Sequence, residues 1–510
     1  MEYITGHVGP LMFAALALFL MIGYPVTFSL GAIGLSFGYL GIQLGLLTPA
    51  LFQALPERIF GIMHNETLLA VPFFTFMGLI LERSGMAEEL LDTIGQLFGP
   101  IRGGLAYAVV FVGALLAATT GVVAASVISM GLISLPIMLR YGYDRRLATG
   151  IIAASGTLAQ IIPPSLVLIV LSDQLGRSVG DMYQGAIYPG LLLTSMYALY
   201  IVGVTVFAPT RAPALPPEAR TLRGWKLLTR VLLVLVPPLA LIFLVLGTIF
   251  LGVATPTEGG AMGATGALAL ALMNRRLTWN LLRQAMNSTA KLSSFVIFIL
   301  IGSTVFTLTF RGVNGDLWIE NMLTSLPGGH IGFLIFVNLL TFILAFFLDF
   351  FELAFIIVPL LGPVAEKLGI DLIWFGILLG INMQTSFMHP PFGYALFYLR
   401  SVSPAKEYVD KITGKLTAPI TTGQIYWGAV PFVVIQIIGV AIVLAVPQLV
   451  TGNLHDVKLD TSKIHISVPL PSYDQVQPGA NVPGTEDQDG SAPPETPTYP
   501  GQDEPEAPSK

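Results

Sequence analysis

The sequences SGTLAQIIPPS at residues 155–165 and NMQTSFMHPPFG at residues 382–393 each place small and polar residues and a proline pair inside a long apolar segment. Proline has no N–H and clashes with the carbonyl one turn back, so two in succession break a helix. Unwound backbone in apolar surroundings is tolerated only where it is buried in protein or lines a wet cavity. The two stretches therefore predict broken helices at a binding site. The alternative is a pair of proline kinks packed against their neighbours.

The composition identifies the apolar surroundings as a lipid bilayer. Hydrophobic residues make up 54% of the 510 residues and charged residues 11%, against about 25% charged in soluble domains. The mean hydropathy is +0.77, and apolar runs near the roughly 20 residues of a spanning helix recur along the chain. We expect an all-α integral membrane protein. The chain has no cysteine, which excludes disulfides and thiolate metal sites, and nothing suggests nucleic acid.

The two halves of the chain resemble each other. A shift of 227 residues superposes the two proline pairs and three further residues that fix the backbone, namely Pro136 on Pro363, Gly142 on Gly369 and Asp144 on Asp371. We therefore expect two repeats, residues 1–208 and 231–450, joined by a polar, basic linker at 209–230. We expect residues 451–510 to form an acidic, proline-rich, disordered tail, because they hold too few apolar residues to fold.

Lysine and arginine predict the orientation. With the linker in the cytoplasm, the cytoplasmic loops hold 18 of the 25 basic residues, as the positive-inside rule requires. An odd number of spans in each repeat makes the repeats inverted, which is typical of secondary transporters. Both termini are then periplasmic. The ten predicted spans are residues 8–23, 25–45, 67–83, 147–171, 185–208, 229–252, 257–273, 289–310, 372–399 and 424–447.

Two apolar stretches remain outside these spans, at residues 104–139 and 331–366, and each is interrupted near its middle. They are either re-entrant hairpins that turn back at the bilayer midplane or ordinary pairs of spanning helices. Arms of roughly 13–18 residues are short for full spans and favour hairpins. Asp349 and Glu352 beside the second interruption are intramembrane acids, which indicates function, although they could instead pair structurally. His389 is expected to pack rather than to carry a proton.

A second acid-containing motif, Thr255-Pro256-Thr257-Glu258, is typical of a helix start. Threonine at the N-cap and glutamate three residues later form a capping box, and proline suits the first helical turn. We expect this motif to be structural.

At these residues the chain resembles the large membrane (permease) subunit of tripartite ATP-independent periplasmic (TRAP) transporters, the DctM-like family. The resemblance covers roughly residues 12–446. Its marks are NETLLAVPFF at 65–74, IRGGL at 101–105, the segment 154–165, ATPTE at 254–258, FLD at 347–349 and LGID at 368–371 followed by WFG at 374–376.

The resemblance implies a Na⁺-driven elevator without other cofactors, in which hairpins and broken helices move against a scaffold. It implies two partners, a small four-helix TRAP membrane subunit and a periplasmic substrate-binding protein, in the bacterial inner membrane. Na⁺ and the organic anion would bind between each hairpin turn and the adjacent break. The candidate residues are Thr120, Gly121, Ser126, Ser155, Gly156, Thr157, Pro163, Pro164, Asp349, Glu352, Asn382, Thr385, Ser386, Pro390 and Pro391.

Two segments depart from the C4-dicarboxylate type of this family. The first turn reads TTGVVAAS at 119–126 where that type carries a Gly-Ser-rich turn, and the second break reads Met388-His389-Pro390-Pro391 where that type tends to carry Thr-Pro-Pro. The segments 349–352 and 389–400 resemble the subgroup for mannitol, chloroaromatic or 2-oxo acid substrates. A monocarboxylate or 2-oxo acid is therefore favoured as substrate.

Two other classes of protein were weighed. A carboxylate or ion antiporter of similar inverted-repeat fold would need no binding protein. An intramembrane or lipid-handling enzyme is disfavoured, because the sequence has no His-Glu-x-x-His pair and no phosphate-binding glycine loop. We therefore expect a transporter and not an enzyme.

The predicted orientation can be tested with reporter fusions. Alkaline phosphatase fused after Gly224 should be inactive, because residues 209–230 face the cytoplasm, and a fusion after Thr451 should be active in the periplasm. Activity after Gly224 or silence after Thr451 would refute the topology.

Overall fold

The computed structural model describes residues 7–410, 412–414, 416–452 and 454. Within these residues the fold is helical, apart from one short antiparallel pair, β1 (Tyr408–Val409) and β2 (Leu416–Thr417), in which Tyr408 lies opposite Thr417. The all-α prediction is therefore confirmed. The tail predicted at 451–510 lies almost entirely outside the described residues.

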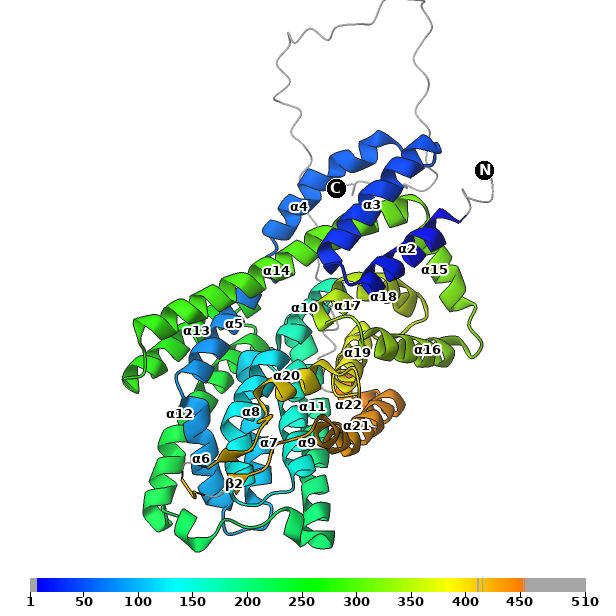
Figure 1. The fold of residues 1–510 in the computed structure, drawn as a ribbon. Helices are drawn as coiled ribbons and strands as arrows, with labels where there is room; N and C mark the ends of the chain where they lie inside the picture. The colour runs from blue at the N-terminus through cyan, green and yellow to red at the C-terminus, as the bar shows by residue number, and fades with distance from the viewer. Residues whose placement is uncertain (1–6, 411, 415, 453, 455–510) are drawn as a thin grey trace, which may run out of the picture. The chain divides into compact units, whose positions relative to one another are not determined.

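Between residues 7 and 208, the described chain forms ten α-helices and two short 3₁₀ segments (Figure 1). They are α2 (Val8–Ile22), α3 (Val26–Gln43), η1 (Pro49–Ala54), α4 (Leu55–Met63), α5 (Ala70–Arg83), α6 (Met86–Phe98), α7 (Gly104–Thr120), α8 (Val123–Arg140), α9 (Arg145–Thr157), η2 (Leu158–Gln160), α10 (Leu166–Gln174) and α11 (Val179–Phe207).

The second half follows two 3₁₀ segments, η3 (Pro209–Arg211) and η4 (Pro217–Ala219). Its helices are α12 (Gly224–Phe250), α13 (Pro256–Met273), α14 (Trp279–Gly312), α15 (Gly315–Thr324), α16 (Gly329–Leu344), α17 (Phe350–Ile356), α18 (Val358–Lys367), α19 (Leu372–Ser386), α20 (Tyr394–Val402), α21 (Thr422–Ala445) and α22 (Gln448–Thr451).

The same offset of 227 residues that relates the sequences also relates the helices. Adding 227 to the bounds of α8 gives 350–367, which are the first residue of α17 and the last residue of α18. The start of α9 at 145 becomes 372, where α19 starts, and α10 becomes 393–401, one residue before α20. The two halves thus repeat one order of helices around their proline pairs.

Two features of the turn before each broken helix, a capping aspartate and a left-handed glycine, occur in both halves. They explain why the helices of the two halves begin at equivalent positions. Asp144 accepts a hydrogen bond from the Leu147 N–H at 3.0 Å, and Asp371 accepts one from the Trp374 N–H at 2.8 Å. Each aspartate therefore caps the helix that leads into a break. The glycine two residues earlier has positive φ in both halves, 80° at Gly142 and 73° at Gly369, a conformation that favours glycine.

Fewer than ten of the described helices are long enough to cross a membrane alone, whereas the sequence predicts ten spans. Six described helices are long and apolar enough to cross a membrane, or seven if α15 and α16, which bend by 116°, count as one. The predicted spans 147–171 and 372–399 are interrupted as expected, into α9, η2 and α10 and into α19 and α20. The count of ten requires such pieces to be joined, and it stays a prediction.

Several boundaries differ from the sequence prediction. α12 begins at Gly224, within the predicted linker, and α14 begins at Trp279, ten residues before the predicted span. Polar and basic residues can occupy a helix that extends beyond the apolar slab, so composition locates the slab rather than the helix end. The predicted helix start at Thr255 is confirmed, because Thr255 and Glu258 form a capping box at the start of α13.

The segment between α20 and α21 has no counterpart of similar length in the first half, and it is tied to α8. Asp410 accepts hydrogen bonds from the Arg140 guanidinium, at 3.0 and 3.2 Å, and from the N–H groups of Ile412 and Thr413. The Thr413 N–H, with smaller contributions from Arg140 and other donors, lowers the pKa of Asp410 to about 2. The carboxylate therefore stays charged at physiological pH and keeps its attraction for the Arg140 guanidinium.

The halves are interleaved in a symmetric way. α8 packs against α20, and α10 packs against α17, so each interrupted helix meets the turn-bearing helices of the other half. α9 lies between α7, α8 and α21 (Figure 1). A separate group of helices packs together as well. In it, α14 packs along α3 and α5, and α13 packs along α5 and α12.

The contact of α9 with α21 depends on two glycines. A Cβ at Gly150 would lie 2.1 Å from the Gly428 carbonyl oxygen, and a Cβ at Gly428 would lie 2.2 Å from the Arg146 carbonyl oxygen. Small residues let membrane helices approach backbone to backbone in this way. The close approach holds α21 against the helix that leads into the first break.

We predict that Gly150→Ala destabilises the protein by roughly 1–3 kcal/mol, because both helices must move apart. Gly203→Ala in α11 is the matched control, since a Cβ there meets nothing within 4 Å. Alanine favours the helix by up to about 1 kcal/mol over glycine, so the control should be neutral or stabilised. Unfolding midpoints in detergent measure both. Equal midpoints for the two variants would show that the contact contributes nothing.

Candidate functional site

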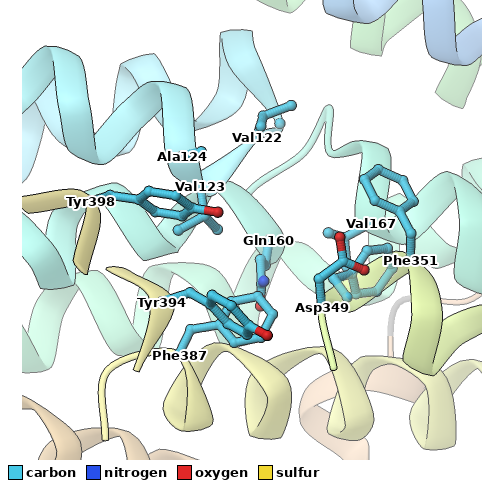
Figure 2. Close-up of a pocket in the computed structure, with 12 residues that line it drawn as sticks. Val122, Val123, Ala124, Gln160, Val167, Asp349, Phe351, Phe387, Tyr394 and Tyr398 are labelled. Carbon is cyan, nitrogen blue, oxygen red and sulfur yellow. The ribbon is translucent and has the colours of Figure 1, made fainter. Parts of the chain in front are cut away.

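A cavity of about 80 Å³ lies where the two helix interruptions of each half meet. We call it the tip cavity (Figure 2). It is lined by Gly121, Val122, Val123, Ala124, Gln160, Val167, Asp349, Phe350, Phe351, Phe387, Tyr394 and Tyr398. These residues come from the α7–α8 turn, the first break, the start of α17 and the second break.

Most of the lining consists of equivalent residues of the two halves. Five lining positions of the first half map onto five of the second with the 227-residue offset. The pairs are Val122 with Asp349, Val123 with Phe350, Ala124 with Phe351, Gln160 with Phe387, and Val167 with Tyr394. The cavity therefore lies where corresponding elements of the halves face each other.

The first turn is fixed by Gly121. This residue ends α7 with φ of 60°, and a Cβ there would lie 2.9 Å from the Leu166 N–H nitrogen. Only a residue without a Cβ fits this approach, so the turn rests directly on the start of α10. Thr120 is the last residue of α7, and its side chain is not among those that the structure describes.

The second turn is fixed by two carboxylates. Asp349 accepts a hydrogen bond from the Glu352 N–H, and Glu352 accepts one from the Asp349 N–H, both at 2.9 Å. This reciprocal pair is a capping box that starts α17. Both acids therefore have a structural role, which the sequence pattern Asp-x-x-Glu already indicates. Asp349 also lines the tip cavity, whereas Glu352 does not.

The described lining of the cavity carries an acidic side chain and no basic one. Asp349 is an acid, and none of the described lining residues is a lysine, arginine or histidine. The other polar groups are the Gln160 amide and the hydroxyls of Tyr394 and Tyr398. Tyr394 donates to the Phe347 carbonyl at 2.9 Å, which ties the second break to the turn between α16 and α17. Figure 2 shows Gln160 between these tyrosines and Asp349.

A buried polar network joins the two breaks behind the cavity. The Gln436 amide donates to the Tyr197 hydroxyl at 2.7 Å and to the Thr157 hydroxyl at 3.4 Å, and the Gln384 amide donates to both hydroxyls at 3.4 and 3.5 Å. Thr157 and Gln384 are themselves 227 residues apart. Equivalent positions of the halves thus touch, and α11 and α21 supply the groups that hold them.

A second group of oxygens lies between α16 and α19. The Asn382 amide donates to the Asn338 carbonyl at 2.6 Å. The side-chain oxygens of Asn338 and of Thr341, one turn further along α16, are buried and have no hydrogen-bond partner among the described residues. Unpartnered buried oxygens are uncommon, and oxygens of this kind are the ligands that alkali cations use.

The structure places the predicted site residues in three groups. Gly121 and Asp349 line the tip cavity. Thr157 and Asn382 belong to the two polar groups beside it. The remaining described candidates lie in the same breaks or in the adjoining helices without lining the cavity, and they are Ser126, Ser155, Gly156, Pro163, Pro164, Glu352, Thr385, Ser386, Pro390 and Pro391.

Four predicted hydroxyls donate to carbonyls of their own helices. Ser155 donates to Ile151 at 2.6 Å, Thr157 to Ala154 at 2.9 Å, Thr385 to Ile381 at 2.9 Å and Ser386 to Asn382 at 3.1 Å. Such bonds fix the hydroxyl and leave its lone pairs to face a ligand. His389 packs against the rings of Phe342 and Phe346, with ring centroids 5.3 and 5.1 Å away.

Sequence reasoning missed most of the polar lining and the polar network. Gln160 and Gln384 lie within the two quoted stretches, but the pattern there favours hydroxyl groups and asparagine as ligands. Gln436 stands alone in the apolar part of α21, where a lone polar residue is itself a signal. Tyr197 has polar neighbours in α11, such as Ser195, and carries no such signal.

Helical membrane architecture with two interrupted segments around a buried cavity defines a membrane transport protein. The chain belongs to the family of the DctM component of tripartite ATP-independent periplasmic transporters, whose model matches residues 13–449. The expected family is thereby confirmed.

Relatives in this family carry different substrate names. The chain is 32% identical to the C4-dicarboxylate TRAP transporter large permease protein DctM of Pseudomonas aeruginosa, over 70% of this chain and 82% of that one. It is 28% identical to the sialic acid TRAP transporter large permease protein SiaM of Vibrio cholerae, over 75% and 87%. In fold it is similar to the YdaH transporter of Alcanivorax borkumensis, with a TM-score of 0.55, 16% identity, and coverage of 86% and 98%.

Substitutions can separate two roles of the Asp349 side chain, namely capping α17 and placing a charge at the cavity. Asparagine also caps helices, so Asp349→Asn should keep stability within about 0.5 kcal/mol, whereas Asp349→Ala should lose about 1 kcal/mol. We expect both variants to lose uptake at least about tenfold, because a charge at the cavity is gone.

Thr255→Ala is the matched control, because Thr255 caps α13 through the same kind of box and does not line the cavity. It should lose similar stability and keep uptake. Unfolding midpoints and uptake into proteoliposomes measure these effects. Normal uptake by Asp349→Asn would show that the carboxylate is only a cap.

Proposed function

We propose that this protein is the large permease subunit of a Na⁺-coupled, binding-protein-dependent uptake system for a small organic acid. The observation that carries the proposal is the tip cavity, which equivalent residues of both halves line at the two turns and the two breaks. Secondary transporters with inverted repeats bind substrate and ions at such interrupted helices, near the bilayer midplane.

The need for a coupling cation is supported by the charges at the cavity. An organic anion entering the cavity meets the Asp349 carboxylate and no basic side chain among the described lining residues. Two like charges in a low-dielectric site repel strongly. Na⁺ bound beside the anion would offset this repulsion. The oxygens of Asn338, Thr341 and Asn382 between α16 and α19 are candidate ligands in the second half.

The lining also favours a monocarboxylate or 2-oxo acid over a dicarboxylate. A second carboxylate would require a second neutralising partner, and arginine is the residue that usually pairs with it in two parallel hydrogen bonds. Valine and phenylalanine side chains dominate the described lining. They fit a substrate with one charged end and an apolar body.

The mechanism and the partners follow from the same proposal. The stretches 104–139 and 331–366 act as re-entrant hairpins of two inverted repeats, and they move with the broken helices as an elevator. A small four-helix membrane subunit completes the scaffold, and a periplasmic binding protein delivers the acid. The complex works in the bacterial inner membrane with both termini of this chain in the periplasm.

Proteoliposomes containing this chain, its small subunit and its binding protein test the proposal. The probe is whichever labelled small carboxylic acid stabilises the binding protein most in a thermal screen. It should accumulate only under an inward Na⁺ gradient, and at least about tenfold less with K⁺ on both sides.

Replacement of Asn382 by leucine should abolish Na⁺-driven uptake, because the polar side chain proposed to help hold the cation is gone. Leucine at Asn274, which ends α13 away from the cavity, should leave it intact. Equal uptake in Na⁺ and K⁺, or full uptake without the binding protein, would overturn the proposal.

A further inference from the structure

The Gln160 side chain has an unmet need for a hydrogen bond. It is 1% exposed, and its side-chain oxygen is buried without a hydrogen-bond partner among the described residues. The backbone carbonyl of the same residue is used, because it accepts a bond from the Ser165 hydroxyl at 2.8 Å. A buried polar atom left unpaired costs about 1–3 kcal/mol, so a group from outside the protein is expected to pair with it.

Gln160 lies at the tip cavity, so a molecule bound there could supply the missing hydrogen bond. The residue lies at the end of η2, at the first break, and lines the cavity. Figure 2 shows its side chain between Tyr394 and Asp349. Apolar side chains such as Val167 and Phe387 surround it in the lining. A bound molecule would therefore meet an amide on one side and a carboxylate on another, with apolar walls between them.

The comparison of the two halves singles this residue out. The equivalent of Gln160 in the second half is Phe387, which lines the same cavity with an apolar ring. The polar side chain is therefore not required to form the break, since the second break forms without it. Its remaining role is toward whatever occupies the cavity.

The chemistry of an amide narrows the class of ligand. A glutamine amide presents an acceptor oxygen and a donor nitrogen, and it can turn over to exchange them. A hydroxyl group both donates and accepts, so it pairs with the amide in either orientation. A keto oxygen only accepts, and a methylene group does neither.

We propose that Gln160 is a specificity-determining residue that recognises a hydroxyl group on the transported acid, so that the cavity prefers hydroxylated monocarboxylates to their deoxy counterparts. This inference rests on the proposed transport of a small organic acid through the tip cavity. A site built to hydrogen-bond a hydroxyl discriminates strongly against an analogue that lacks it, because the amide is then left unpaired.

The experiment compares matched acids on the purified complex of this chain with its small subunit, without the binding protein. Lactate, pyruvate and propionate form one set, and 2-hydroxy-4-methylpentanoate, 4-methyl-2-oxopentanoate and 4-methylpentanoate form the other. Ligands that bind the folded state raise the unfolding midpoint according to concentration and affinity. In at least one set, the wild-type complex should bind the 2-hydroxy acid about tenfold more tightly than the deoxy acid.

Gln160→Met keeps the length of the side chain and removes the amide. It should abolish the preference for the hydroxy acid while the affinity for the deoxy acid changes less than about twofold. Gln53→Met, at an exposed glutamine in η1, is the control and should keep the preference.

The outcomes separate the two proposals. If no acid in either set stabilises the wild type, the proposed substrate class is wrong. If acids bind but the wild type shows no hydroxyl preference, or Gln160→Met keeps it, the role of Gln160 is refuted and the proposed function stands. The wild-type comparison decides the question even if Gln160→Met does not fold.

Discussion

Backbone that leaves helical geometry within apolar surroundings must find partners for its N–H and C=O groups inside the protein. The two proline pairs create this demand twice. The structure meets it by packing each interrupted helix against the turn-bearing helices of the opposite half, α10 against α17 and α8 against α20. A cavity at this meeting point is a consequence, because broken backbone and helix starts cannot pack as densely as continuous helices.

The same constraint explains which residues the two halves share. The capping aspartates Asp144 and Asp371 and the left-handed glycines before them fix where the broken helices begin. These positions tolerate few residue types, so they stay recognisable in both halves. Most of the lining residues do not fix the backbone in this way. Val122 and Asp349, or Gln160 and Phe387, occupy equivalent places with different chemistry, and the symmetric frame thus holds an asymmetric site.

This division also sets how much the sequence could predict. Proline pairs, glycine turns and capping boxes are local signals, and from them the broken helices, the interrupted apolar stretches and the start of α13 were predicted correctly. Helix ends such as that of α14 were not, because polar residues beyond the apolar slab continue a helix without any change of period. The polar network of Tyr197, Gln384 and Gln436 depends on contacts between distant segments, which one sequence does not reveal.

Asp349 shows how a structural and a functional demand can meet in one side chain. Its carboxylate caps α17 and also faces the tip cavity. A cap alone could be supplied by serine, threonine or asparagine, all of which serve at helix starts, and Thr255 does so at α13. A buried negative charge beside apolar rings costs more than any of these alternatives. Under the proposed function, a cation that accompanies an organic anion would recover this cost while it is bound, and an uncharged cap could not attract that cation in the same way.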